Sequence, residues 1–344
     1  MRAKPASRLG PTVRARAWCR VDFAGGTLDI WPLGLLHPGA RTVNVAIDLP
    51  VAVQLHPRGR TFRVRHEEGT VEARTAEELG THPETALVGT VLAALDSPPV
   101  EVRVHSASPR GGGLGASSAL TVALIAGVEE LRGKRRSSAK EIVALARDLE
   151  ARLMALPTGI QDHYPALLGG ALEIVHGAGG HRVRRLAVDL ARLGESLTVV
   201  YSGQSHFSAG NNWEIVRGRL DGDRRIAELF AGIAEVAAEV PAALERGDFQ
   251  RVGELMLREW GFRRHLAAGV STPGIERLLR KALALGAWGG KACGAGGGGS
   301  IALLCPPERR TAIGEALAAA GGTLLATRPI GARLRVGKGH PDPG

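Results

Sequence analysis

One segment limits the folds open to this chain more than any other: a glycine-rich run at 109–119 that reads PRGGGLGASSA. Before it, residues 100–105 (VEVRVH) alternate apolar and polar side chains, which predicts a half-exposed β-strand. After it, the spacing predicts a helix over 117–132. Glycines between a strand and a helix bring backbone N–H groups and the positive end of the helix dipole to one place. The segment therefore predicts a phosphate-binding loop at Gly111–Gly115, although an ordinary glycine-rich turn has a similar composition.

This loop departs from the P-loop pattern, because no lysine stands at its end. The dinucleotide pattern fits formally through Gly111, Gly113 and Ala116, with Glu129 or Glu130 as the acid that would bind a ribose. The first strand of a dinucleotide-binding fold is apolar on both faces, whereas the strand before this loop alternates. A Rossmann-type NAD-dependent oxidoreductase therefore stays open as a second hypothesis.

The composition excludes several classes of protein. The chain has 344 residues, 44% hydrophobic and 23% charged, which is typical of a globular protein of about two domains. Its three cysteines are too scattered for a disulfide framework, and no apolar run approaches the ~18 residues of a membrane span. We therefore expect a cytoplasmic protein that does not bind membranes.

The net charge of +10 fits either an anionic ligand or a solvated, arginine-rich surface. Proteins that bind nucleic acid usually cluster their basic residues and interleave aromatic ones, but only 4% of these residues are aromatic and the arginines are spread along the chain. We expect a small-molecule substrate and no nucleic acid. A basic binding protein without catalytic activity stays open as a third hypothesis.

Periodicity along the chain predicts strands and helices that are mixed without regular βα alternation, which favours an α+β fold in two domains. Ser138 and Glu141 predict a capping box at the start of an amphipathic helix that ends near Pro157. Further strands are expected at 43–55, 61–68, 70–74, 171–176, 197–203, 301–305 and 323–336, and further helices at 84–96, 211–247, 249–268, 273–287 and 308–320. The arginine-rich stretch 182–194 predicts a hinge, and the polar residues 1–10 and 337–344 predict frayed termini.

Four segments together resemble the GHMP small-molecule kinases, a family named after galactokinase and the homoserine, mevalonate and phosphomevalonate kinases. The glycine-rich loop is similar to the family's second motif, P-x-x-x-G-L-G-S-S-A, with one extra residue before the two serines. RVDFAGGTLDIWP at Arg20–Pro32 resembles the first motif, GAWGGKACGAGGGGS at Gly286–Ser300 the third, and PTGIQDHYPALLGG at 157–170 the catalytic segment. The form of the motif with this extra residue resembles that of the sugar 1-kinase branch, which contains D-glycero-D-manno-heptose 7-phosphate kinase and fucokinase.

This resemblance implies the two-domain α+β fold of the GHMP kinases. Residues 11–190 would form an N-terminal mixed βα domain that binds the nucleotide and carries the catalytic groups, and residues 191–336 a C-terminal ferredoxin-like α/β-plait domain. The resemblance also implies ATP and Mg²⁺ as cofactors, and the anomeric hydroxyl of a sugar or sugar phosphate as the acceptor. A non-sugar kinase of the mevalonate or homoserine type remains the alternative within the family.

The resemblance also implies roles for individual residues. Asp162 matches the catalytic carboxylate and Arg20 the basic residue beside it, which suits the chemistry because an alcohol needs a base that a nearby cation keeps ionised. Ser117 and Glu150 match the Mg²⁺ ligands. Contacts with ATP are expected from Pro109, Gly111, Gly112, Gly113, Leu114, Gly115, Ala116, Ser117 and Ser118, and contacts with the substrate from Asp29, Gly25, Gly26, Gly296 and Gly297.

Plain structural roles compete with three of these assignments. Asp162 would serve equally well as a helix N-cap, Arg20 as a surface residue of a strand, and Glu150 as a solvated residue of its helix. Only the motif context favours the functional roles.

The chain departs from the branch in places that bear on the substrate. Motif one reads G-G-T-L-D where the branch tends to read G-G-G-T-D, and His163 stands where a glutamine is common. We expect Trp31 to pack in the core rather than against a sugar ring. Arg263 and Arg264 would either bind a phosphate on the substrate or lie on a helix surface, where Glu259 is the acid at helical spacing.

Overall fold

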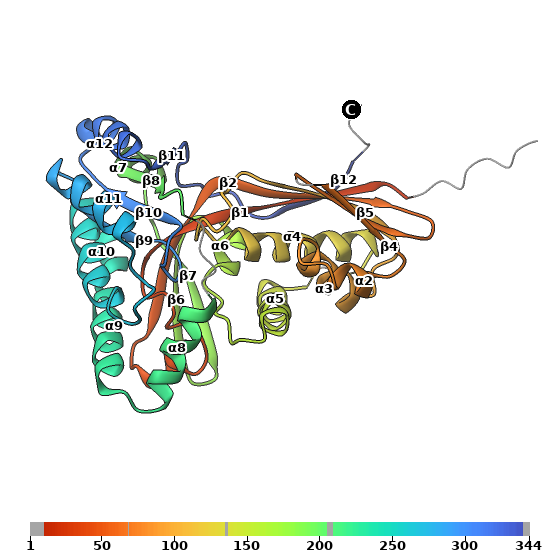
Figure 1. Ribbon diagram of the computed structural model, residues 1–344, viewed down its shortest axis with the longest axis horizontal. Helices are drawn as coiled ribbons and strands as arrows, with labels where there is room; N and C mark the ends of the chain where they lie inside the picture. The colour runs from red at the N-terminus through yellow and green to blue at the C-terminus, as the bar shows by residue number, and fades with distance from the viewer. Residues whose placement is uncertain (1–9, 68, 135–136, 205–208, 340–344) are drawn as a thin grey trace, which may run out of the picture.

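The computed structural model describes residues 10–339 except 68, 135–136 and 205–208, and its first part is built on an eight-stranded sheet (Figure 1). The strand order is β12-β1-β2-β5-β3-β4, and β6 and β7 continue from β2. The strands are β1 (Thr12–Ala24), β2 (Arg41–Pro57), β3 (Phe62–His66), β4 (Gly69–Ala73), β5 (Val100–Ser106), β6 (Ala171–Gly177), β7 (Gly180–Arg185) and β12 (Arg335–Gly339).

Strands β1 and β2 are long, and the two ends of β2 pair with different strands. The last residues of β2, Val51–Pro57, pair with β5, whereas its first residues, Arg41–Val45, pair with β6. Irregularities in the β1–β2 register fall between Trp18 and Arg20 and again between Asp22 and Ala24, and such bulges bend a strand. Arg20 and Asp22 therefore lie in the segment of β1 where these irregularities bend the strand.

The helices of the first part cover one face of the sheet (Figure 1). They are α2 (Ala76–Gly80), α3 (Ala86–Ala94), α4 (Ala116–Leu131), α5 (Ala139–Met154) and α6 (His163–Leu168), while the short α1 (Leu33–Leu36) precedes β2. Helix α4 packs on β1 and β2 and is buried over most of its length. The capping box predicted for α5 is confirmed, because the Ser138 side chain accepts from the Glu141 N–H and the Glu141 carboxylate accepts from the Ser138 N–H.

The second part is a four-stranded antiparallel sheet with helices against it. Its strands, in the order β11-β8-β10-β9, are β11 (Thr323–Leu325), β8 (Leu197–Tyr201), β10 (Ser300–Leu304) and β9 (Gly289–Ala292). The helices are α7 (Leu190–Ser196), α8 (Ala209–Leu220), α9 (Arg224–Glu245), α10 (Phe249–Arg263), α11 (Pro273–Ala284) and α12 (Pro307–Ala319). The chain order β-α-β-β-α-β with this strand order is the ferredoxin-like plait that the resemblance implies, so the α+β class is confirmed. The boundary at residue 190 stays a prediction.

Two expectations about the chain's course are wrong. The strand expected at 323–336 divides between two sheets, because β11 pairs with β8 whereas β12 returns to pair antiparallel with β1. Residues 337–339 are therefore part of β12 and not frayed; residues 1–9 and 340–344 lie outside the described part of the chain. Residues 182–194, expected as a hinge, contain the end of β7 and the start of α7, and the hinge itself stays a prediction. Within the described residues, no helix combines the length and the apolar character needed to cross a bilayer.

Candidate active site

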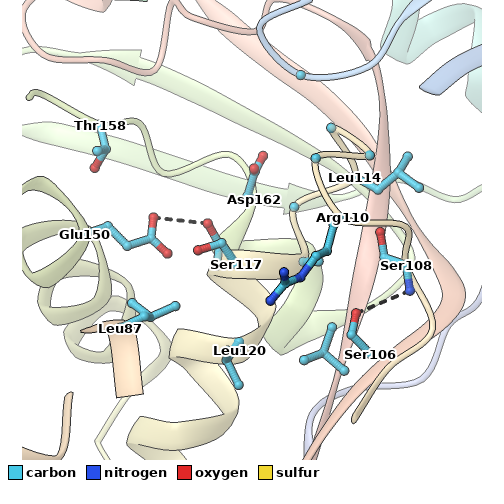
Figure 2. A pocket seen from close by; sticks show the side chains of 18 of the residues that line it. Leu87, Ser106, Ser108, Arg110, Leu114, Ser117, Leu120, Glu150, Thr158 and Asp162 are labelled. Atoms are coloured by element: carbon cyan, nitrogen blue, oxygen red, sulfur yellow. Dashed lines mark hydrogen bonds between the residues drawn. The ribbon is translucent and has the colours of Figure 1, made fainter. Parts of the chain in front are cut away.

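A cavity of about 710 Å³ gathers all four motif segments. Figure 2 shows part of its lining, with Leu114, Glu150 and Asp162 around one space. Residues Ser108 to Ser118, which follow β5, line the cavity. Glu150 of α5 and Asp162, the residue before α6, also line it. Arg20 of β1 and the loop Gly25–Ile30, through Thr27, Asp29 and Ile30, form another wall, and Gly294 and Ala295 of the third motif complete it. Segments far apart in the sequence thus meet around one space.

The glycine-rich loop has a backbone that a larger side chain would disturb. Gly113 and Gly115 have φ of 69° and 74°, in the left-handed region that favours glycine. A Cβ at Gly113 would lie 2.8 Å from the Cys293 carbonyl oxygen, so the third motif packs directly on this loop. Gly115 is the N-cap of α4 and has no side chain to occupy the free N–H groups of the first turn. Ala116, Ser117 and Ser118 of this turn line the cavity, so their free N–H groups are available to bind an anion there.

The loop carbonyls are held by the protein. Arg20 donates its backbone N–H to the Leu114 carbonyl at 2.9 Å and its Nη1 to the Gly113 carbonyl at 2.6 Å, while the Ser300 N–H bonds the Gly112 carbonyl at 2.8 Å. With these oxygens directed into protein contacts, the loop presents few acceptors to an anion.

Asp162 and Arg20 form an ion pair at the wall of the cavity. Arg20 Nε donates to Asp162 Oδ1 at 2.7 Å, and the Asp162 side chain remains 25% exposed. Asp162 occupies the N-cap position of α6, but its carboxylate makes no capping hydrogen bond, so the N-cap role does not use this side chain. Arg20 is 1% exposed, which shows that the surface role considered for it is wrong.

Burial has the largest effect on the pKa of Asp162 and raises it above the ordinary value of 3.8, although the Arg20 cation acts in the opposite direction. The carboxyl is therefore a stronger base than a solvated aspartate, and the adjacent cation favours its ionised form.

Glu150 is buried on α5 and not solvated, contrary to the plain structural role considered for it. Its carboxylate accepts from Ser118 Oγ at 3.1 Å and from Thr121 Oγ1 at 3.0 Å, and Oε2 lies 3.3 Å from His163 Nε2. Burial acts to raise the pKa of Glu150, but His163 and the hydroxyl hydrogen bonds outweigh it and lower the pKa. Ser117 is exposed on the first turn of α4 and lines the same cavity. Figure 2 shows Ser117 and Glu150 on facing helices.

Asp29 is held firmly by one carboxylate oxygen. Its Oδ2 accepts from the N–H groups of Ile160 at 2.6 Å and Gln161 at 2.9 Å, and a side chain at Gly159 would collide with this carboxylate. The other oxygen, Asp29 Oδ1, is buried without a hydrogen-bond partner, and so is Gln161 Oε1. Burial has the largest effect on the Asp29 pKa and raises it. The two unsatisfied acceptors thus belong to cavity-lining residues that are joined by the hydrogen bond from the Gln161 N–H to Asp29.

The predicted substrate glycines lie behind the cavity wall. Gly25, Gly26, Gly296 and Gly297 are absent from the residues that line the cavity in the described structure, whereas their neighbours Thr27 and Ala295 are present. The Gly297 N–H bonds the Val270 carbonyl at 2.7 Å, and a side chain at Gly25 would collide with the Arg41 backbone. These glycines shape the two loops, and their contact with substrate stays a prediction.

The expectations for two other side chains are wrong. Trp31 does not pack in the core, because it is 74% exposed. Arg263 lies neither on a helix surface nor open to a substrate phosphate: it is 1% exposed and its guanidinium is bound to Glu259, with Nη2 2.6 Å from Oε1. Arg264 is exposed and pairs with Glu276 at 3.4 Å.

Two side chains near the site escaped the sequence analysis. Thr121 stands four residues after Ser117 on α4, so helical spacing already places both hydroxyls on one face. Lys291 is fully buried and pairs with the equally buried Asp22 of β1. The sequence signal for this buried pair was a single lysine among the small and apolar residues of 286–300.

Comparison with known proteins agrees with the motifs. Residues 84–170 match the model of the GHMP kinases N terminal domain, and residues 242–323 match that of the GHMP kinases C terminal. A mevalonate kinase of Pyrococcus abyssi is 32% identical over 246 residues, which cover 69% of this chain and 68% of that protein. The chain belongs to the GHMP kinase family. It is thus a small-molecule kinase, which excludes the oxidoreductase and the non-catalytic binding protein as alternatives.

Two other relatives of this GHMP kinase match over nearly its whole length. The D-glycero-alpha-D-manno-heptose 7-phosphate kinase of Campylobacter jejuni is 26% identical over 89% of this chain and 93% of its own. The crystal structure of a D-glycero-D-manno-heptose 1-phosphate kinase from Bacteroides thetaiotaomicron superposes with a TM-score of 0.76, at 20% identity, over 96% of this chain and 100% of that one. This second match supports the fold.

Gly113→Ala should weaken nucleotide binding at least about tenfold, because the new methyl group requires the loop or the third motif to move. Gly133→Ala is the matched control: Gly133 has a φ of 62°, but a Cβ there meets no atom within 4 Å. Both variants carry similar backbone strain, so calorimetric titration with a non-hydrolysable ATP analogue isolates the effect of the collision. Equal affinity in the two variants would contradict the placement of the nucleotide at this loop.

Proposed function

We propose that this GHMP kinase transfers the γ-phosphoryl group of ATP to a hydroxyl of a sugar or sugar phosphate, with the anomeric hydroxyl as the acceptor. The observation that carries the proposal is the Arg20–Asp162 pair, 2.7 Å apart, at the edge of the glycine-rich loop. A carboxylate base beside an anion-binding helix N-terminus is the arrangement that alcohol phosphorylation requires.

The cavity suits ATP in shape and chemistry. The free N–H groups at the start of α4 suit the phosphates, and glycines at 111–115 allow the close approach that a side chain would prevent. Beyond the loop, the cavity has a group of apolar side chains that suit a purine base: Val51, Val64, Leu87, Val88 and Val104.

In the proposed reaction, Asp162 accepts the proton of the acceptor hydroxyl while the hydroxyl oxygen bonds to the γ-phosphorus and the bond to the ADP oxygen breaks. Arg20 keeps the carboxylate ionised and ties it to the Gly113 carbonyl, so the base and the phosphate loop hold one relative position. Positioning of this kind supplies a large part of catalysis in phosphoryl transfer.

Glu150 and Ser117 fit Mg²⁺ as the resemblance implies. Magnesium prefers hard oxygen ligands and keeps several waters, so one carboxylate and one hydroxyl suffice when phosphate oxygens complete the shell. The described residues contain no group of three or more His, Cys, Asp or Glu side chains that would form a closed metal site. Bound there, Mg²⁺ would neutralise charge on the phosphates.

The choice of a sugar acceptor is supported by two observations. The heptose 7-phosphate kinase relative matches almost the whole chain. In addition, the buried and unpaired oxygens Asp29 Oδ1 and Gln161 Oε1 need donors, and the adjacent hydroxyls of a sugar supply them. A mevalonate acceptor is the second candidate, because the Pyrococcus abyssi mevalonate kinase has the higher identity, 32%, over two thirds of the chain.

A panel of acceptors tests the proposal. ADP release should be measured with D-glycero-D-manno-heptose 7-phosphate, the unphosphorylated heptose, L-fucose, D-galactose and mevalonate. We expect the highest kcat/KM with one of the sugars, and phosphorus NMR of the product should place the new phosphate on the anomeric carbon. The highest kcat/KM with mevalonate would contradict the sugar assignment.

Glu150→Gln and Ser117→Ala should each raise the Mg²⁺ concentration needed for half-maximal activity roughly tenfold or more, because each change removes a charge or an oxygen from the metal's surroundings. Asp148→Asn is the matched control for the first variant, since Asp148 is an exposed acid of the same helix that pairs with Arg147. Magnesium titrations of initial rate, at saturating ATP and acceptor, measure the effect. Unchanged titrations in both site variants would place the metal elsewhere.

A further inference from the structure

Arg263 of α10 reaches from the second part of the molecule to the loop that carries Asp29. Its Nη2 donates to the Gly26 carbonyl at 2.7 Å and its Nη1 to Thr27 Oγ1 at 3.2 Å. Its Nε donates to Glu259 at 2.9 Å, and the whole side chain is 1% exposed. One planar guanidinium therefore joins a helix of the ferredoxin-like part to the Gly25–Ile30 loop.

The loop needs such support because its backbone is strained. Thr27 has a φ of 73°, a left-handed conformation that is costly for a β-branched residue. Surrounding contacts must hold a residue in that conformation, and the Thr27 side chain is bonded directly to Arg263. Two residues later, Asp29 presents its unpaired Oδ1 at the cavity wall.

Arg263 is also the last member of a buried row of alternating charges that starts at the catalytic pair. Asp22 Oδ1 lies 3.3 Å from Arg20 Nη1, and Asp22 Oδ2 pairs with Lys291. Lys291 Nζ lies 3.8 Å from Glu259 Oε2, and Glu259 binds Arg263. The row is thus Asp162, Arg20, Asp22, Lys291, Glu259 and Arg263.

All members of the row except Asp162 are at most 1% exposed. Buried ion pairs contribute little stability relative to a well-packed apolar core, so their value lies in the geometry that they define. At one end of the row, Asp162 lines the cavity. At the other end, Arg263 donates to Thr27, which lines the cavity too. The row therefore relates the position of the base to the position of the loop.

We propose that Arg263 is a positioning residue that holds the Gly25–Ile30 loop, and with it Asp29, in register with Asp162 for binding of the acceptor. Three of its N–H groups are used at once in a fixed fork, a geometry that the single ammonium of a lysine does not reproduce. Loss of the fork should therefore disturb the acceptor side of the cavity and leave the phosphate loop in place. This role rests on the proposed function, in which Asp29 contacts the acceptor.

The test compares Arg263→Lys with the control Arg264→Lys. The Arg264 side chain is 42% exposed and pairs with Glu276. Kinetics use the member of the acceptor panel that the wild-type enzyme takes best, so a wrong sugar assignment is detected in the wild type alone. We expect Arg263→Lys to raise KM for the acceptor at least about tenfold, with KM for ATP within about twofold of wild type, and Arg264→Lys to change neither. Unchanged acceptor KM in Arg263→Lys, or an equal rise in both KM values, would overturn the proposal.

A pair of variants at Thr27 keeps the test open if Arg263→Lys does not fold by circular dichroism. Thr27→Val removes the hydroxyl that accepts from Arg263 but retains the shape, whereas Thr27→Ser retains the hydroxyl. We expect the valine variant to raise the acceptor KM and the serine variant to restore it. Equal acceptor KM values in these two variants would overturn the proposal.

Discussion

The guanidinium of Arg20 is the group on which the arrangement of the active site depends. It donates to the Asp162 carboxylate at 2.7 Å and to the Gly113 carbonyl at 2.6 Å, and it lies 3.3 Å from the Asp22 carboxylate. The proposed base, the glycine-rich loop and the buried charges therefore share one donor, which lies next to a register irregularity in β1. Since the side chain is 2% exposed, water competes little for these contacts.

Burial of this many charges carries a large desolvation free energy, and the alternation of their signs offsets it. Removal of an ion from water costs several kcal/mol, and a partner of opposite sign at contact distance offsets that cost only when the geometry is good. Burial acts to raise the pKa of Asp22, but the cations Lys291 and Arg20 together outweigh it and lower the pKa, so this carboxylate stays ionised. The partners come from β1, β9 and α10, which means that the row forms only when both parts of the chain are folded together.

Local signals in the sequence predicted local structure well. Alternation predicted β2 to β6, the Ser138 capping box predicted the start of α5, and the glycine-rich motif predicted the loop at the cavity. Errors arose where a distant partner decides the outcome: β12 pairs with β1 more than 300 residues earlier, and Arg263 is buried by Gly26 and Thr27. Trp31 was expected in the core on its apolar character alone, but its loop leaves it 74% exposed. The motifs predicted which segments meet, whereas burial and ion pairing required the three-dimensional structure.

The central claim is that Asp162 is the base, and the pH dependence of kcat/KM tests it most directly. Because the folded-state pKa of Asp162 is raised, the base is protonated, and activity lost, as pH falls through a value above the ordinary 3.8. The account predicts this acidic limb in the wild type, and predicts that Asp162→Asn is about 10² to 10⁴ times slower, lacks the limb and still binds ATP. An Asp162→Asn enzyme with near wild-type turnover, or with the same acidic limb, would contradict the account.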